Sequence, residues 1–219
     1  MIWLPVGDAP PELTPRDLDV PETVLAIGAV GDHAHELSAV ELDYLDGAVE
    51  SRRREFSTGR MLARQALSRL GAPVGPLLRR PDRAPIWPDD ICGSISHCRH
   101  WAVALASRSV RSAGVDIECR ERVSSRTHDS LFTPVELARA VAAGVEPTVL
   151  FSAKEAIFKA VHQITREQIE FLEAEVRLDV AAQRFRARYL GTSRRSRIME
   201  QVRGVVCLTP DHVLTLALL

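Results

Sequence analysis

The hydrophobic pattern of the chain changes between strand-like and helix-like spacing several times, and the order of these changes limits the fold. Strand-like stretches alternate apolar and polar residues or form short apolar runs, whereas helical stretches repeat apolar residues along one stripe. Groups of strands and groups of helices follow one another, which favours an α+β fold with two sub-domains that meet near residue 110. The expected strands are residues 24–30, 95–106, 113–118, 173–180, 184–190, 202–208 and 213–218, and the expected helices lie within residues 38–70, 134–143 and 148–164.

Prolines and polar residues mark the connections between these elements. Residues 8–22 contain four prolines and are expected to be irregular. Pro81, Pro85 and Pro88 interrupt residues 76–90, which are expected to form a loop. The polar stretch from Ser107 to Ser112 predicts a turn that joins residues 95–106 and 113–118 in a hairpin.

The composition excludes several classes of protein. With 219 residues, of which 46% are hydrophobic, the chain can bury a substantial core. The formal net charge of −1 provides no overall attraction to nucleic acid or to an anionic membrane. No apolar run approaches the roughly 18 residues that a membrane span needs, and no secretory leader is recognisable. Because the four cysteines form no C-x-x-C pair, we expect a reduced, cytoplasmic protein.

The segment from Gly114 to Glu118 reads Gly-Val-Asp-Ile-Glu and predicts a strand with two acids on one face. Side chains alternate along a strand, so Asp116 and Glu118 lie together, opposite Val115 and Ile117. Two adjacent carboxylates repel each other, and a divalent cation such as Mg²⁺ would relieve that repulsion. The alternative is an edge strand whose acids simply face water.

The segment from Phe151 to Ala160 predicts a helix that carries both lysines of the chain, Lys154 and Lys159. Glu155 and Lys159 are four residues apart, so their side chains can meet on one helix face. Such a pair is often an ordinary surface ion pair. Here its neighbours are apolar or small, which favours a more specialised role.

A small, hydroxyl-rich turn, Gly-Ser-Ile-Ser-His, spans residues 93–97 just before a strand-like run. Backbone amides, a serine hydroxyl and an imidazole are suitable donors to phosphate oxygens. The chain has no G-x-S-x-G motif, which argues against a serine hydrolase. Arginines upstream of this turn provide further phosphate donors or form a solvated helix face. They are Arg52, Arg53, Arg54, Arg60, Arg79, Arg80 and Arg83.

Three of these segments, in this order, resemble the signatures of the Sfp-like class of 4′-phosphopantetheinyl transferases. The segments are Ser96-His97, residues 114–118, and residues 151–159. Residues 53–60 and 87–98 are most similar to the branch typified by enterobactin-synthetase component D. The resemblance covers about residues 40–180. It departs from the family at Arg83-Ala84-Pro85, where many members have Gly-Lys-Pro or Gly-Glu-Pro.

The resemblance implies an enzyme that moves the 4′-phosphopantetheine arm of coenzyme A to a serine of an acyl, aryl or peptidyl carrier protein. The other product is adenosine 3′,5′-bisphosphate. Asp116, Glu118 and Glu155 would bind Mg²⁺, for which Mn²⁺ can substitute. Glu155 would act as the base, directly or through water, and Lys159 would stabilise the leaving phosphate. The resemblance also implies that His97 belongs to the catalytic site. The residues that would contact coenzyme A are Arg52, Arg60, Arg79, Arg80, Arg83, Ser96, His97, Lys154 and Lys159.

The resemblance also implies two similar α+β halves related by a pseudo-two-fold axis, each a small sheet with helices. Residues 1–110 would contain the basic groups and the Ser-His turn, and residues 111–219 the carboxylates, the Lys-Glu helix and the meander. Coenzyme A would lie in a cleft between them, and the protein would act as a monomer on carriers of siderophore, polyketide or nonribosomal peptide synthesis. Two alternatives are a metal-dependent phosphohydrolase acting on a nucleotide or on the coenzyme A pyrophosphate, and a non-catalytic nucleotide-binding module.

Overall fold

The fold combines helices with two separate β-sheets, as the sequence predicts. The computed structural model describes residues 1–6 and 20–219, so most of the irregular entry expected at residues 8–22 lies outside the described residues. The described residues divide into two compact units, one formed by residues 1–6 and 20–109 and the other by Val110–Leu219. Among the described helices, none is both long and apolar enough to cross a lipid bilayer.

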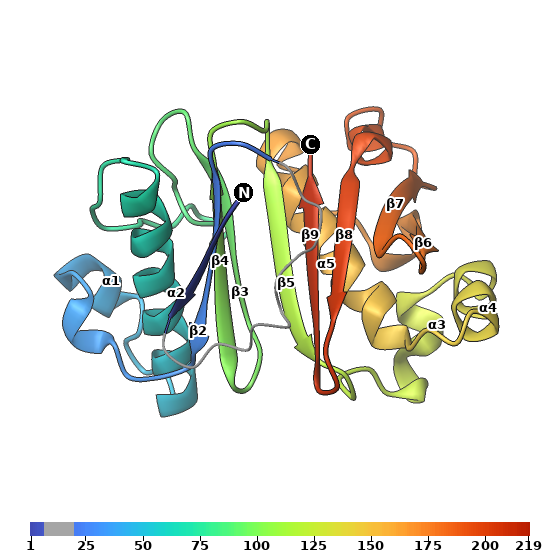
Figure 1. Ribbon diagram of the computed structural model, residues 1–219, viewed down its shortest axis with the longest axis horizontal. Coiled ribbons are helices and arrows are strands. Elements are labelled where there is room, and N and C mark those ends of the chain that lie inside the picture. Colours follow the sequence, from blue (N-terminus) through green and yellow to red (C-terminus); the bar gives the residue numbers. More distant parts are fainter. Residues whose placement is uncertain (7–19) are drawn as a thin grey trace. The chain divides into compact units, whose positions relative to one another are not determined.

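The first unit is a four-stranded sheet with one long helix on one face (Figure 1). The strand order is β1-β2-β4-β3, in which β1 runs parallel to β2 and the other neighbours are antiparallel. The predicted helical region is divided into a short α1 and a long α2. The elements are β1 (Ile2–Val6), β2 (Thr23–Ala29), α1 (Ala39–Asp43), α2 (Glu50–Arg69), β3 (Cys92–His97) and β4 (Trp101–Ser107).

The second unit is a five-stranded antiparallel sheet with the order β5-β9-β8-β7-β6. Its long helix α5 lies against β5 and β9 (Figure 1). The four predicted strands of the C-terminal meander are all present. The elements are β5 (Ala113–Cys119), α3 (His128–Leu131), α4 (Pro134–Ala142), α5 (Pro147–Thr165), β6 (Ala174–Asp179), β7 (Arg184–Tyr189), β8 (Arg203–Leu208) and β9 (His212–Leu218).

The predicted hairpin between residues 95–106 and 113–118 is wrong. The hairpin is formed by β3 and β4, and its turn is closed by the amide of Cys98, which donates to the carbonyl of Trp101 at 2.8 Å. Strand β5 pairs instead with β9 in the second unit. The turn residues 98–100 include no glycine, proline or asparagine, so the pattern there looked like one continuous strand.

The two units share one chain path. In each unit, one strand precedes the long helix and pairs with the last strand of that unit. These pairs are β2 with β4 and β5 with β9. Beyond β4 lies β3, at the edge of the first sheet, and beyond β9 lies β8, from which β7 and β6 extend the second sheet. This common path agrees with the expectation of two similar halves.

Small residues allow α5 to lie directly on β5. Its buried stripe includes Ala153, Ala156 and Ala160, and the facing residue on β5 is Gly114. A Cβ atom at Gly114 would lie 1.9 Å from the carbonyl oxygen of Ala156, so only glycine fits at this contact. The close approach brings residues of α5 onto the face of β5 that carries Asp116.

We expect Gly114→Ala to destabilise the protein strongly. The added methyl group would meet backbone atoms of a helix that cannot move without breaking its packing, so the free energy of unfolding should fall by about 3 kcal/mol. Gly75→Ala is a matched control, because nothing lies within 4 Å of the added atom. Urea denaturation of both variants measures the difference, and equal stability would contradict the packing argument.

Candidate active site

A cluster of acids and one lysine forms where β5 meets α5. Asp116 is buried, with 2% of its surface exposed, and the Lys159 ammonium donates to its Oδ1 at 2.7 Å. The same ammonium donates to the carbonyl oxygen of Val115 at 3.1 Å. Lys159 therefore links the helix to the strand through both a side chain and the backbone.

The three carboxylates of this cluster are electrostatically coupled. The pKa of Glu118 is raised to about 7, chiefly by burial and also by the neighbouring Asp116, against the opposing effects of Arg122 and Lys159. The pKa of Glu155 is also raised, chiefly by burial. The charge of Lys159 opposes this shift, and that of Asp116 adds to it. Partly buried acids that repel one another provide the all-oxygen donor set that suits Mg²⁺. Asp116, Glu118 and Glu155 therefore fit the metal that the resemblance implies.

The first unit contains a basic cavity of about 470 Å³. Arg79 packs its guanidinium over the ring of Tyr44, 4.0 Å from the ring centre, and lies 5.6 Å from that of Phe56. These aromatic faces hold a flat cation in place, and its Nη2 donates to the carbonyl oxygen of Tyr44 at 3.2 Å, which leaves its other N–H groups for a ligand. The cavity is lined by Tyr44, Arg52, Glu55, Phe56, Arg60, Arg79, Arg83, Pro85, Ile95 and His97.

Arg60 is the most buried cation of this cavity. Only 5% of its side chain is exposed, and its Nε lies 3.8 Å from Oε1 of the fully buried Glu41. Burial lowers the pKa of Arg60 to about 10, which still leaves it protonated at neutral pH. A buried guanidinium beside a cavity is a strong site for a phosphate oxygen.

His97 is held by two residues of α2. Arg52 lies with Nη1 2.8 Å from Nε2 of His97, and because a guanidinium only donates, Nε2 must accept. The ring proton is therefore on Nδ1, which faces Oε2 of Glu55 at 3.5 Å.

Five of the predicted coenzyme A residues meet in the cavity: Arg52, Arg60, Arg79, Arg83 and His97. Four others do not line it: Lys154 and Lys159 of the second unit, and Arg80 and Ser96 of the first. Arg80 is exposed in the turn that its backbone forms with Ala84, and Ser96 points to the opposite face of β3 from His97. Coenzyme A contacts of these two residues stay predictions.

The aromatic wall of the cavity was not predicted as part of a site. Tyr44 follows α1 and Phe56 lies on α2, and their rings pack edge to face with centres 6.5 Å apart. A signal was present in the sequence, because Phe56 follows the arginine-rich start of α2. Nothing local, however, indicates that Arg79 returns to pack on both rings.

The prediction that Lys154 binds coenzyme A phosphates is wrong. Its side chain is fully buried, and its ammonium pairs with Oε2 of Glu136 at 2.8 Å. It also donates to the carbonyl oxygens of Leu131 at 2.8 Å and Phe171 at 2.7 Å. These acceptors satisfy the three protons of the ammonium, so Lys154 has a structural role.

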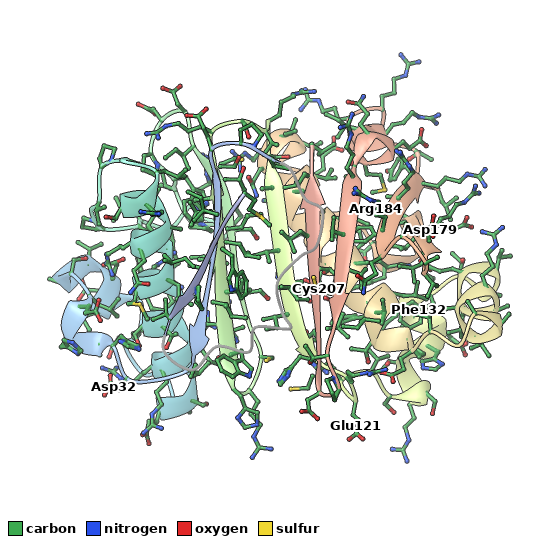
Figure 2. The ribbon with its side chains drawn as sticks, viewed as in Figure 1. Asp32, Glu121, Phe132, Asp179, Arg184 and Cys207 are labelled. Atoms are coloured by element: carbon green, nitrogen blue, oxygen red, sulfur yellow. The ribbon has the colours of Figure 1, made fainter. Side chains whose placement is uncertain are left out.

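The lysine joins parts of the second unit that are separate in sequence. Its acceptors come from the end of α3, from α4 and from the turn before β6, and Figure 2 shows Phe132 in this region, beside α3. Burial lowers the pKa of Lys154 and raises that of Glu136, and the attraction between the two groups opposes both shifts. Removing either group would therefore leave the other buried without its partner.

We expect Lys154→Met to lower the free energy of unfolding by about 3–5 kcal/mol, because it leaves the Glu136 carboxylate buried without its partner. The double variant Lys154→Met with Glu136→Leu should recover much of this loss, since an apolar pair of similar volume needs no compensation. Chemical denaturation of the two single variants and the double variant tests this coupling. Additive losses in the double variant would contradict the buried pair.

Comparisons with known proteins match both units of the chain. Residues 41–107 match the family model for the 4′-phosphopantetheinyl transferase N-terminal domain, and residues 112–217 match the model for the 4′-phosphopantetheinyl transferase superfamily.

Several curated proteins are similar to the chain. The 4′-phosphopantetheinyl transferase Npt of Nocardia iowensis is 32% identical over 73% of this chain and 77% of that protein. The corresponding enzymes Svp of Streptomyces mobaraensis and PptT of Mycobacterium tuberculosis are 38% and 34% identical, over 68% and 65% of this chain.

The matched part spans 64% of Svp and 66% of PptT, slightly less than two thirds of each. Enterobactin synthase component D of Escherichia coli O157:H7 is 37% identical over 53% of this chain and 58% of that protein, which confirms the predicted branch. With both units matched and the motifs in their expected order, the chain belongs to the 4′-phosphopantetheinyl transferase family.

Proposed function

We propose that the protein transfers the 4′-phosphopantetheine arm of coenzyme A to a serine of an acyl, aryl or peptidyl carrier protein and releases adenosine 3′,5′-bisphosphate. The observation that carries this proposal is the cluster of Asp116, Glu118, Glu155 and Lys159 at the contact of β5 and α5. Relatives named 4′-phosphopantetheinyl transferases support it.

The chemistry is a displacement at phosphorus. The serine oxygen forms a bond to the phosphorus that carries the pantetheine arm, and the bond from that phosphorus to the bridging oxygen breaks. The serine proton passes to a base, and the negative charge goes to the phosphate of adenosine 3′,5′-bisphosphate. Such a reaction needs charge stabilisation more than any other contribution from the protein.

Each residue of the cluster has a role in this scheme. Glu155 is the base, and its raised pKa makes it a better proton acceptor than an exposed glutamate. Lys159 stabilises the charge that develops on the leaving phosphate. Asp116, Glu118 and Glu155 would hold Mg²⁺ or Mn²⁺, which would neutralise charge on the pyrophosphate oxygens.

The basic cavity of the first unit binds the nucleotide end of coenzyme A in this proposal. Arg52, Arg60, Arg79 and Arg83 offer fork-shaped donors that suit phosphate groups, and His97 offers an imidazole. The aromatic rings of Tyr44 and Phe56 keep Arg79 in position.

The setting of the reaction is also part of the proposal. The expected division of labour assigns coenzyme A binding to residues 1–110 and the metal site to residues 111–219. We propose a cytoplasmic monomer that serves carriers of siderophore, polyketide or nonribosomal peptide synthesis. Relatives named enterobactin synthase component D support the siderophore case.

Intact mass measurement of a carrier protein, after incubation with coenzyme A and Mg²⁺, tests the activity directly. Addition of one phosphopantetheine group to the carrier is the expected result. Cleavage of coenzyme A with no change in the carrier mass would instead identify a phosphohydrolase. Binding of coenzyme A without either reaction would identify a binding module.

We expect Asp116→Ala and Glu155→Ala to lower the turnover rate at least about 10²-fold, because each removes a metal ligand and leaves charge on the pyrophosphate uncompensated. Glu121→Ala is the control, since this exposed acid follows β5 and lies outside the cluster. Single-turnover transfer rates at several Mg²⁺ concentrations provide the measurement. Transfer at the wild-type rate by Asp116→Ala, with Mg²⁺ still required, would remove the metal assignment.

We expect Arg60→Ala and His97→Ala to act mainly on coenzyme A recognition. Loss of a hydrogen bond from a charged donor costs about 1.5–3 kcal/mol, so kcat/KM for coenzyme A should fall about 10-fold or more for Arg60→Ala. Dephospho-coenzyme A, which lacks the 3′-phosphate, should distinguish the sites, and Arg69→Ala serves as an exposed control on the same helix. If both variants and the wild type discriminate equally between the two substrates, neither residue contacts the 3′-phosphate.

A further inference from the structure

A second basic hollow lies in the other unit, on strands β6, β7 and β8. Its volume is about 430 Å³, and four of the side chains that line it are arginines. Figure 2 labels Asp179 and Arg184, which lie here at the end of the β6–β7 hairpin. The residues that line this arginine hollow are Arg177, Leu178, Asp179, Arg184, Phe185, Arg186, Arg203 and Gly204.

The strand register places the arginines on one face of the sheet. Arg184 and Arg186 alternate with the buried Phe185, and Arg177 on β6 lies directly opposite Arg186. Arg184 lies opposite Val205 on β8, so Arg203, two residues before Val205, shares the same face. Like charges directly opposite each other destabilise a sheet. Asp179 lies opposite Arg184 and offsets part of this repulsion, whereas Arg177 and Arg186 remain a like-charge pair.

Among the described residues, carboxylates neutralise only part of this charge. Glu175 accepts hydrogen bonds from Arg139 at 3.0 Å and from Arg177 at 3.1 Å, so it is shared between two guanidiniums. Within the described residues, no carboxylate lies within ion-pair distance of Arg186 or Arg203. Four arginines and one aspartate give the lining a charge of +3, in a chain whose formal net charge is −1.

We propose that the arginine hollow docks an acidic segment of a partner protein. Arg186 on β7 and Arg203 on β8 lie on the same face of two neighbouring strands, about 4.8 Å apart. Guanidiniums bind carboxylates through two parallel hydrogen bonds, so a few aspartates or glutamates of a partner segment can engage both arginines. The inference does not depend on the transferase activity.

The lining favours a protein over other polyanions. Phe185 is its single aromatic residue and is 1% exposed, so the hollow offers no ring on which a nucleic-acid base can stack. Asp179 would repel an unbroken row of phosphates, whether from nucleic acid or from lipid headgroups. A protein surface of mixed charge can place a basic or neutral group opposite Asp179.

Binding of a fluorescent oligo-glutamate peptide tests the proposal. The measurement uses the full chain with saturating coenzyme A, which occupies the basic cavity of the first unit if that cavity binds as proposed. The double variant Arg186→Glu with Arg203→Glu should raise the Kd for the peptide at least tenfold at low salt. The pair Arg69→Glu with Arg194→Glu changes the net charge equally at exposed sites outside the hollow and should change the Kd less than twofold.

Further variants and ligands distinguish the possible outcomes of this binding experiment. The neutral variant Arg186→Ala with Arg203→Ala should also weaken binding, and melting temperatures show whether each variant is folded. Equal loss in the hollow variant and the control would reduce the effect to net charge and overturn the proposal, as would unchanged binding in both hollow variants. Tighter binding of a single-stranded oligonucleotide or of phosphatidylserine vesicles through the same arginines would overturn the choice of a protein partner. Failure of coenzyme A to bind would contradict the proposed function but leave the peptide result interpretable.

Discussion

The close contact between α5 and β5 is the constraint on which the second unit depends. A helix packs against a sheet at a distance set by the side chains between them, and here Gly114 and the alanines of α5 reduce that distance to a minimum. The strand supplies Asp116 and Glu118, and the helix supplies Glu155 and Lys159. Because rigid backbone elements carry all four groups, their geometry is fixed before any ligand arrives. Preorganisation of this kind lowers the cost of stabilising charge during a reaction.

Buried charge is handled in three ways in this protein. Lys154 and Glu136 neutralise each other inside the core, with backbone carbonyls completing the shell of the ammonium. Around β5, acids outnumber the single lysine, so negative charge remains. Beside the cavity of the first unit, the lining residue Arg60 shares Glu41 with Arg64, so positive charge remains. Charged groups that are fully paired stabilise the fold, whereas an excess of one sign of charge indicates a site for a ligand of the opposite charge.

Local periodicity predicted the parts of the site that lie on one element. Alternation along residues 114–118 correctly placed Asp116 and Glu118 on one face, and helical spacing placed Glu155 and Lys159 near each other. The same helical spacing also indicated that Lys154 is buried, which the sequence prediction overlooked. Leu150, Ala153, Ile157 and Val161 form the buried stripe of α5, and Lys154 lies within that stripe. A lysine on an apolar helix face needs a buried acid, but its partner Glu136 could not be identified from spacing within one helix.

Features that join distant segments could not be predicted in this way. The packing of Arg79 on Tyr44 and Phe56 requires a loop to return to two helical segments, and the arginine hollow depends on strand register. The β3–β4 hairpin was missed because its turn lacks the residues that usually mark one. In each case the deciding contacts join residues that are far apart in the sequence. A single sequence shows the residue types of the two partners but not that they meet.

The burial of Lys154 has a consequence for the chemical modification of this protein. The chain has two lysines, and the side chain of Lys154 is 0% exposed while that of Lys159 is 28% exposed. An amine-selective reagent applied to the folded protein therefore meets one lysine side chain, and that side chain belongs to the carboxylate cluster. Apart from the α-amino group, which peptide mapping distinguishes, a label or crosslinker would thus be attached at the cluster without any engineered residue.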